Sequence, residues 1–131
     1  GVLWWRILLL YFCFITVKAY CTALCKLRCS NHNLMIEYGR RLQLERKDRL
    51  CPFCVIPTIE SELHFCLECP FYEDLRSCLI QEFYYTFPSI NKLNLLFTSR
   101  NTVVIRNLAK FVFLAMKKRE KHFECGWYVY L

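Results

Sequence analysis

Four side chains near the middle of the sequence have the types and the spacing that bind a metal ion. Cys51 and Cys54 form a CxxC pair, and the chain then runs nine residues to His64 and four more to Cys69. A CxxC turn lets two thiolates hold one ion, and a second pair completes a tetrahedron of sulfur and imidazole ligands. We predict a structural zinc site made by Cys51, Cys54, His64 and Cys69. The alternative is a group of buried or disulfide-bonded cysteines beside an incidental histidine.

Cys66 competes for the fourth ligand position because it lies between His64 and Cys69. If one helix holds both His64 and Cys66, their side chains diverge by roughly 200°, so we predict a buried core thiol at Cys66. Pro70 suits the first position of a helix, and this places Cys69 at a helix N-terminus. There the helix dipole favours the thiolate, which is the form that binds metal.

Nothing in the sequence assembles a catalytic centre around this site. Four protein ligands leave zinc no open position for water, and Asp48 and Asp74 are the only aspartates for two-metal chemistry. There is neither a phosphate-binding glycine loop nor a nucleophile in an activating motif. Cys25, Cys29 and His32 share one helix face but lack a fourth ligand, so we interpret them as core or interface groups. We therefore expect no enzymatic activity and no small-molecule substrate.

The formal net charge is +7, and the charged residues are segregated along the chain. Residues 100–121 hold seven bases and one acid, whereas residues 60–74 hold five acids and no base. This asymmetry indicates a polyanionic partner, either nucleic acid or an anionic membrane surface, although solvated helix faces can have the same composition. The candidate phosphate contacts are Arg40, Arg41, Arg46, Lys47 and Arg49 before the zinc loop, and Arg106, Lys110, Lys117 and Lys121 on the last helix. With no base-reading motif, we expect RNA or DNA binding with little sequence preference.

Helices are the elements that must position these residues. At 131 residues the chain has the length of one domain, and it lacks the alternation typical of strands. Helical spacing of apolar residues predicts a helix over residues 20–38 closed by Gly39, and another over residues 102–122. The apolar face of the second helix comprises Val104, Leu108, Phe111, Val112 and Ala115. We predict a mainly α fold, a small helical domain with a zinc-stapled CxxC loop.

Prolines divide the segment between these two long helices. After Pro57, Thr58 can cap a short helix that carries Glu60 in its first turn, where the helix dipole favours an acid. A further helix is predicted over residues 71–85, with Phe83 as part of its packing stripe.

The chain divides into five segments. These are a hydrophobic leader (1–20), a helix with a basic stretch (21–49), the zinc-binding segment (50–70), a helical C-terminal part (71–122) and an apolar tail (123–131). The apolar run in the leader is too short to span a membrane but has the length of a signal-peptide core, so a secretory start at residues 1–19 stays open. The same run is also compatible with a buried core helix or with sequence from outside the true reading frame. Because the first residue is Gly, we expect a fragment, a processed product or an imperfect gene model.

The ten cysteines are unevenly spaced, and one group of them has the form of a metal site. This favours a reducing, intracellular compartment, the nucleus or the cytoplasm, over a small secreted disulfide protein.

Several short runs of the sequence together resemble a known family. They are Leu27-Arg28-Cys29-Ser30-Asn31-His32, Glu37-Tyr38-Gly39-Arg40, Arg49-Leu50-Cys51-Pro52-Phe53-Cys54, Glu62-Leu63-His64-Phe65, Cys69-Pro70-Phe71-Tyr72-Glu73-Asp74-Leu75-Arg76, Asn107-Leu108-Ala109-Lys110-Phe111 and Lys117-Lys118-Arg119-Glu120. This arrangement resembles the zinc-binding tail downstream of the reverse transcriptase in non-LTR retrotransposon polyproteins. The resemblance covers roughly residues 27–121. It implies an isolated fragment or remnant that assists the handling of element RNA or target DNA.

The leading hypothesis is therefore a non-catalytic, zinc-stabilised nucleic-acid-binding accessory module. Three thiolates and one Zn²⁺ leave the cluster with a charge of about −1, which makes it a poor ligand for phosphate. We expect the zinc instead to position the basic segments on either side of it. The alternative is a structural or protein-interaction module that packs against a missing upstream reverse transcriptase domain.

Overall fold

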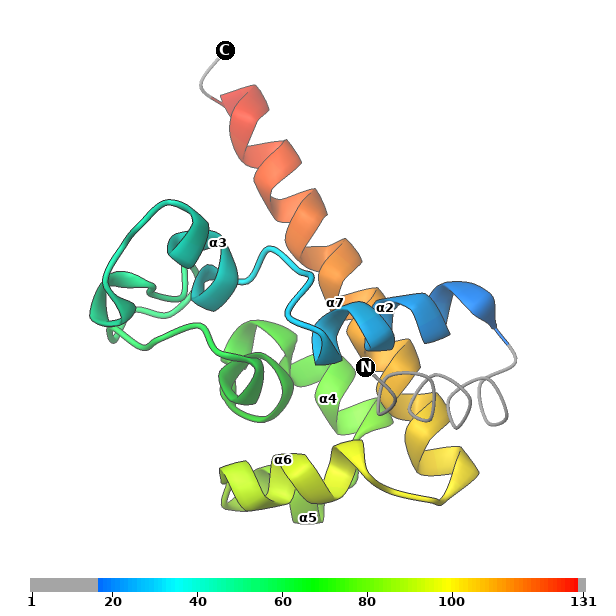
Figure 1. Ribbon diagram of the computed structural model, residues 1–131. Helices are drawn as coiled ribbons and strands as arrows, with labels where there is room; N and C mark the ends of the chain where they lie inside the picture. The colour runs from blue at the N-terminus through cyan, green and yellow to red at the C-terminus, as the bar shows by residue number, and fades with distance from the viewer. Residues whose placement is uncertain (1–16, 130–131) are drawn as a thin grey trace.

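The computed structural model describes residues 17–129, with side chains up to residue 124, and is built from helices and turns (Figure 1). In chain order the elements are α2 (Lys18–Arg28), α3 (Met35–Arg41), η1 (Arg46–Asp48), η2 (His64–Glu68), η3 (Pro70–Tyr72), α4 (Glu73–Leu79), α5 (Glu82–Thr86), α6 (Ile90–Phe97) and α7 (Thr102–Val129). The described residues form no β-strand, only an isolated antiparallel bridge between Leu50 and Ile59. The prediction of a small, mainly α domain is confirmed.

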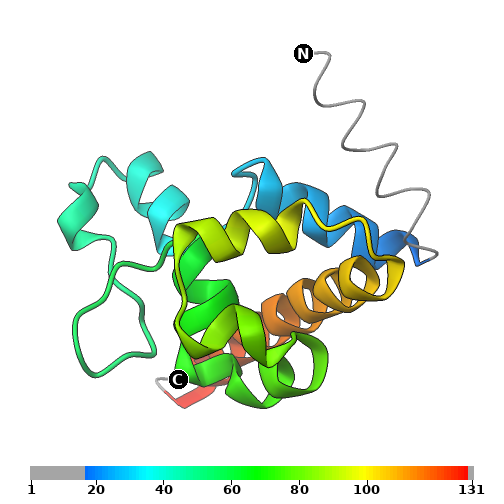
Figure 2. The same cartoon turned by 90° about the horizontal axis from the view of Figure 1, so that it is seen from below.

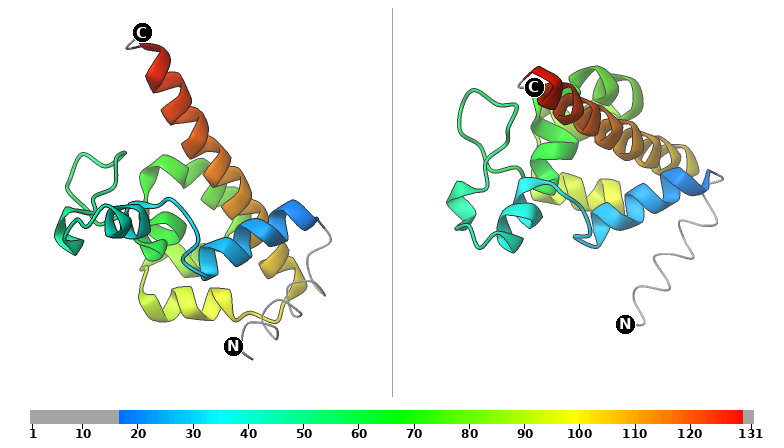
Figure 3. Two further views of the ribbon diagram at one scale, coloured as in Figure 1. Left: turned by 45° about the horizontal axis from the view of Figure 1, so that its top comes forward. Right: turned by 90° about the horizontal axis from the view of Figure 1, so that it is seen from above.

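The long helix α7 organises the domain. Helices α2 and α4 pack against it, while α5 and α6 form a pair near its N-terminal end (Figures 1 and 2). The segment that contains α3 and η1 forms a lobe at one side of the molecule (Figure 3). No helix within residues 17–129 combines the length and the apolarity needed to cross a membrane.

The core lies along the apolar face of α7. Leu108, Phe111, Val112 and Ala115 are buried there as predicted, while Val104 is only half-buried. Buried side chains from α2 and from the central segment complete the core, among them Leu24, Leu27, Leu34, Phe65 and Tyr72. Helical periodicity identified this face correctly because one side of a long helix must meet the rest of the domain.

The prediction of one helix over residues 20–38 was wrong, because the chain forms two helices with a turn between them. Helix α2 ends in a Schellman motif, in which Ser30 adopts a left-handed conformation with φ 58°. The Asn31 N–H donates to the Lys26 carbonyl (2.9 Å) and the Ser30 N–H donates to the Leu27 carbonyl (3.3 Å). These bonds satisfy carbonyls that the helix end leaves without partners.

Gly39 does not close a helix as predicted, since it lies buried inside α3. A Cβ atom at this position would stand 2.6 Å from Cγ of Arg49. The glycine is therefore required for the close approach of the Arg49 side chain to α3. From there the Arg49 guanidinium donates to the carbonyls of Leu44 (3.0 and 3.1 Å) and Ile36 (3.2 Å).

Two further predictions about the middle of the chain were wrong. Thr58 is not a helix cap, because it lies in a hairpin-like turn and the helical segment begins only at Glu62, where the Ser61 hydroxyl accepts a hydrogen bond from the His64 N–H (3.2 Å). The helix expected over residues 71–85 is interrupted at Ile80, which is extended and buried, so α4 and α5 are separate. As a result Phe83 is 58% exposed and does not join the core.

Most of the predicted leader lies outside the described residues, as do residues 130–131 of the apolar tail. The signal-peptide alternative at residues 1–19 belongs to that part, since only residues 17–19 of it are described. In the tail, the α7 backbone continues to Val129.

Candidate metal centre

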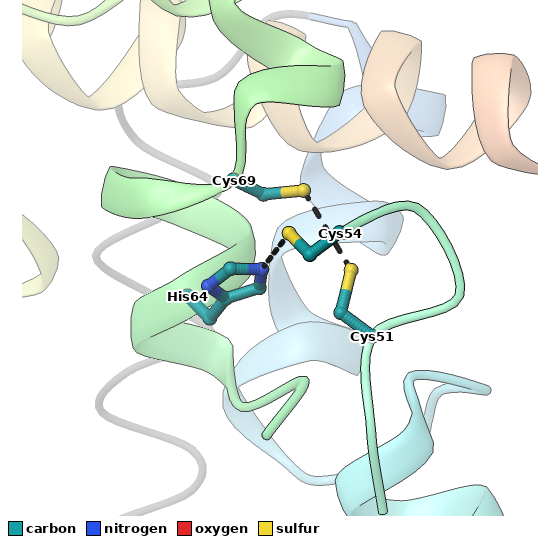
Figure 4. A group of neighbouring side chains, drawn as sticks. All are labelled: Cys51, Cys54, His64 and Cys69. Atoms are coloured by element: carbon teal, nitrogen blue, oxygen red, sulfur yellow. Dashed lines mark hydrogen bonds between the residues drawn. The ribbon is translucent and has the colours of Figure 1, made fainter. Parts of the chain in front are cut away.

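A hairpin-like turn supplies the first two cysteines of the cluster. The Glu60 N–H donates to the Arg49 carbonyl (3.0 Å), and the Cys51 N–H donates to the Thr58 carbonyl (2.8 Å). These two bonds hold the arms of the turn together, and residues 52–53 then reverse the chain so that Cys54 returns toward Cys51. The CxxC spacing is thus realised as a turn with both thiols on one side (Figure 4).

His64 and Cys69 come from one π-helical turn, η2. The Cys69 N–H donates to the His64 carbonyl at 2.7 Å, which is the five-residue bond of a π-helix. Cys69 itself is extended (φ −63°, ψ 122°), as a residue before proline prefers, and Pro70 begins η3. The extra residue in this turn and the extended Cys69 bring the fourth ligand back to the histidine. Cys69 lies at the start of η3 as the sequence predicted, although that element is a single turn before α4.

The four ligand atoms form a compact group. Every pair among the three Sγ atoms and the His64 nitrogen is within 4.8 Å. Cys51 Sγ lies 3.8 Å from Cys69 Sγ, and Cys54 Sγ lies 3.3 Å from His64 Nε2 (Figure 4). A tetrahedral ion with bonds of about 2.3 Å to sulfur and about 2.0 Å to nitrogen needs edges of about 3.8 Å and 3.5 Å. The Cys51–Cys69 and Cys54–His64 distances are close to these edges.

The contact between the two thiols, together with burial and backbone hydrogen bonds, shifts the pKa values of the cysteines. The contact with Cys69 lowers the pKa of Cys51, and the Phe53 N–H, which also bonds to this sulfur, lowers it further. The same contact with Cys51 raises the pKa of Cys69, with burial adding to the effect, while a bond from the Phe71 N–H opposes it. Burial also raises the pKa of Cys54. The thiols thus share protons among themselves, and a bound metal ion would displace those protons.

The orientation of His64 also suits a metal ligand. Its Nε2 faces the cysteines, while its Nδ1 is buried without a hydrogen-bond partner and lies 3.6 Å from Oε1 of Glu68. A metal ion on Nε2 would leave the ring proton on Nδ1, directed toward this carboxylate. Carboxylates commonly orient metal-binding histidines in this way.

No protein-family model, curated protein or solved structure matches this chain.

The cluster is the one group of potential metal ligands that gathers within the described residues. Its atoms fit an ion of tetrahedral preference, and the soft sulfur-rich donor set is of the kind that binds such ions. Cys66 is fully buried and stays outside the cluster, as predicted. The eight described cysteines are all free thiols, so none of them forms a disulfide.

Cys25, Cys29 and His32 do not gather into a second site, because the turn after α2 separates His32 from the helix. His32 Nδ1 accepts a hydrogen bond from the Leu34 N–H (3.2 Å), so its Nε2–H donates to Glu62 (2.9 Å). The histidine therefore ties this turn to the segment before η2.

Residues that the sequence analysis missed connect the centre to α7. Glu60 and Arg119 are buried and form an ion pair of 2.7 Å, and the same Glu60 oxygen accepts the Met35 N–H at 2.7 Å. Arg119 also lies 5.7 Å from the ring centre of Phe53, inside the CxxC turn. A signal for this role was present, because Arg119 continues the apolar face of α7 one turn after Ala115.

A second missed residue, Arg76 of α4, secures the helical turn that carries His64. Arg76 is buried and donates to the carbonyls of Cys66 (2.8 Å) and Phe65 (3.2 Å). It thereby satisfies carbonyls near the end of η2. No pattern in the sequence indicated this contact, since Arg76 follows two acids in an ordinary helical arrangement.

The predicted basic contacts lie in two parts of the molecule, and their role in binding nucleic acid stays a prediction. Those of the lobe are Arg40, Arg41, Arg46, Lys47 and Arg49, and those of α7 are the exposed residues Arg106, Lys110, Lys117 and Lys121. Several have intramolecular partners: Arg40 pairs with Glu37 (2.7 Å), Arg41 donates to the Asn33 side chain, Lys47 pairs with Glu45 (3.3 Å) and Lys117 pairs with Glu120 (3.6 Å).

Proposed function

We propose that this chain is a non-catalytic, zinc-stabilised nucleic-acid-binding accessory module. The observation that carries the proposal is the convergence of Cys51, Cys54, His64 and Cys69 at distances suited to one tetrahedral ion. The module is of the type that follows the reverse transcriptase in non-LTR retrotransposon polyproteins, which the sequence resembles.

Zinc is the proposed ion because of its ligand preference. Three thiolates and one imidazole form a soft set, and zinc takes four such ligands without demanding a redox partner. Four protein ligands also leave no position for an activated water molecule, which supports a structural role. Zinc sites of this kind contribute free energy directly to folding.

Nucleic acid is the proposed partner because the excess of positive charge faces outward. Two acids are already engaged by cations within the domain: Glu60 by buried Arg119, and Asp74 by Lys118 (3.2 Å). The chain as a whole carries a net charge of +7. A polyanion would gain from contacts with such a surface through release of its counterions.

A salt titration tests this function. The zinc-loaded protein should bind labelled single-stranded RNA or duplex DNA, and the logarithm of the affinity should fall linearly with the logarithm of the salt concentration. Absence of binding to either nucleic acid at low salt would refute the proposal.

A second candidate is a structural module that packs against an upstream reverse transcriptase domain. Exposed apolar side chains on and beside α5 and α6 favour this candidate, because a partner domain could cover them. They are Phe83, Phe87 (79% exposed), Ile90 and Leu95. A zinc-loaded chain that is monomeric in sedimentation and binds neither RNA nor DNA would support this candidate over the first.

A further inference from the structure

A cleft of about 1190 Å³ is lined by α2, by the loop that follows it and by the C-terminal half of α7. We call it the α2–α7 cleft. Its walls include Lys18, Thr22 and Lys26 from α2, and Phe113, Lys117 and Phe123 from α7. The loop after α2 and the first part of α3 close one side. The cleft is larger than most binding sites for small ligands, and its surface is concave.

Aromatic side chains line the cleft with part of their surface open. Tyr38 is 44% exposed and Phe123 is 40% exposed, although both are large apolar groups, and Phe113 is half-buried beside Tyr20. Unpaired bases stack on such side chains, and this contact tolerates any base.

Cations stand on both walls of the cleft. Lys18 and Lys26 lie eight residues apart on α2, hence about 12 Å along one side of that helix. Lys117 stands on the opposite wall with its side chain 55% exposed. The acids of the cleft, Glu120 and Glu124, belong to α7, and the 3.6 Å pair of Glu120 with Lys117 is an exposed one that contributes little. The α2 wall therefore carries positive charge without acids.

The metal centre supports one end of the same cleft. Pro52, from within the CxxC turn, and Arg119 both contribute to its lining. Arg119 is fixed by Glu60 and lies 4.9 Å from the ring centre of Phe123. A metal ion that holds the turn in place would thus hold this end of the cleft in shape.

We infer that the α2–α7 cleft binds a short single-stranded segment of nucleic acid. The inference rests on the proposed function and adds where the strand lies and why it must be unpaired. Phosphates contact Lys18 and Lys26, and bases stack against Tyr38 and Phe123. A duplex keeps its base faces stacked inside, so it cannot use the aromatic side chains of a concave site in this way.

The test compares charge reversals inside and outside the cleft. The probe is an oligouridylate of about 15 nucleotides, which is within the range of known single-strand sites. One variant carries Lys18→Glu with Lys26→Glu, and the matched control carries Arg46→Glu with Lys47→Glu on η1. All four positions are exposed, and both variants change the net charge equally. Circular dichroism and zinc content would verify that each variant remains folded and loaded.

The cleft variant should bind the probe about tenfold more weakly or worse, and its salt slope should fall by about 1.4 for two lost phosphate contacts. The η1 variant should retain more of the affinity. Tyr38→Ala should cost about fivefold or more through lost stacking. Photocrosslinking with a thiouridine probe should label peptides that contain Tyr38 or Phe123.

Wild-type affinity in the cleft variant and in Tyr38→Ala would overturn the inference. That result is also expected if the cleft receives a protein segment instead of a nucleic acid. If the η1 variant alone loses affinity, the cleft is refuted while the proposed function stands. If the wild-type protein binds neither the probe nor a duplex, both this inference and the proposed function are refuted.

Discussion

The rings of Phe53 and Phe71 stack in parallel, with centroids 3.9 Å apart and planes inclined by 4°. Each phenylalanine follows a ligand cysteine in the same Cys-Pro-Phe order, and the N–H of each bonds to the sulfur of that cysteine. The metal centre thus has two similar halves, one from the hairpin-like turn and one from the end of η2. Their aromatic contact holds the two halves of this candidate metal centre together.

Replacement of Phe53 by alanine should weaken both the fold and the metal site. Loss of the stacked pair and of the neighbouring aromatic contacts should lower the free energy of unfolding by about 1–3 kcal/mol. Urea denaturation and competition with a zinc chelator would measure the two effects. Phe83→Ala, at an exposed position, is the control and should change neither. Equal effects of the two substitutions would contradict the role of the stack.

The buried pair of Arg119 and Glu60 should be costly to break from one side. Arg119→Met leaves the Glu60 carboxylate buried without its cation, so at a pH above about 7, where this carboxyl is ionised, we expect the free energy of unfolding to fall by about 3–5 kcal/mol in denaturant unfolding. Lys121→Met, on the exposed face of the same helix, should change stability by less than about 0.5 kcal/mol. Similar losses of unfolding free energy in the two variants would show that the Arg119–Glu60 pair does not join α7 to the metal centre.

A methyl group at position 39 should displace Arg49. In Gly39→Ala the new Cβ would approach Cγ of Arg49 to 2.6 Å, close to the backbone, where the side chain has little freedom to move away. We expect the free energy of unfolding to fall by about 1–3 kcal/mol, because the arginine must shift away from its carbonyl partners. Thermal unfolding followed by circular dichroism measures the change. An unchanged melting temperature would mean that the lobe adjusts without cost.

The pH dependence of stability should carry a contribution from Glu60. Burial raises the pKa of this carboxyl from 4.5 to about 7, against the opposing effect of Arg119. Because the folded state binds the proton more tightly, this contribution is complete below about pH 4.5 and is lost as the pH rises toward 7. The advantage of the wild-type protein over Glu60→Gln should therefore shrink across that range. A difference in unfolding free energy between the two proteins that stays constant or grows with pH would contradict the raised pKa of Glu60.

Local patterns predicted the parts of the structure that depend on one segment at a time. The apolar face of α7 follows from its periodicity, and the gathering of Cys51, Cys54, His64 and Cys69 follows from residue type and spacing. The turn after α2 was missed because apolar residues continue at helical spacing through it, while the left-handed Ser30 gives no strong signal. The π-helical turn of η2 was also missed. Its extra residue depends on where Cys69 lies in the fold, and no local pattern indicates that position.

The features that local patterns did not predict depend on contacts between distant segments of the chain. Glu60 has the position of a first-turn helix acid by sequence, but in the fold it is buried against Arg119, 59 residues away. Buried ion pairs of this kind depend on which surfaces meet, and a single sequence does not specify them. The cleft between α2 and α7 has the same origin, because its lining comes from four separate segments.

Metal analysis of purified protein tests the central claim most directly. The protein should contain one zinc per chain, Cys51→Ser should lose it, and Cys66→Ser should keep it. The two cysteines form a matched pair, since both are buried but only Cys51 belongs to the cluster. A wild-type protein without zinc, or a Cys66→Ser variant that loses the metal while Cys51→Ser retains it, would contradict the account.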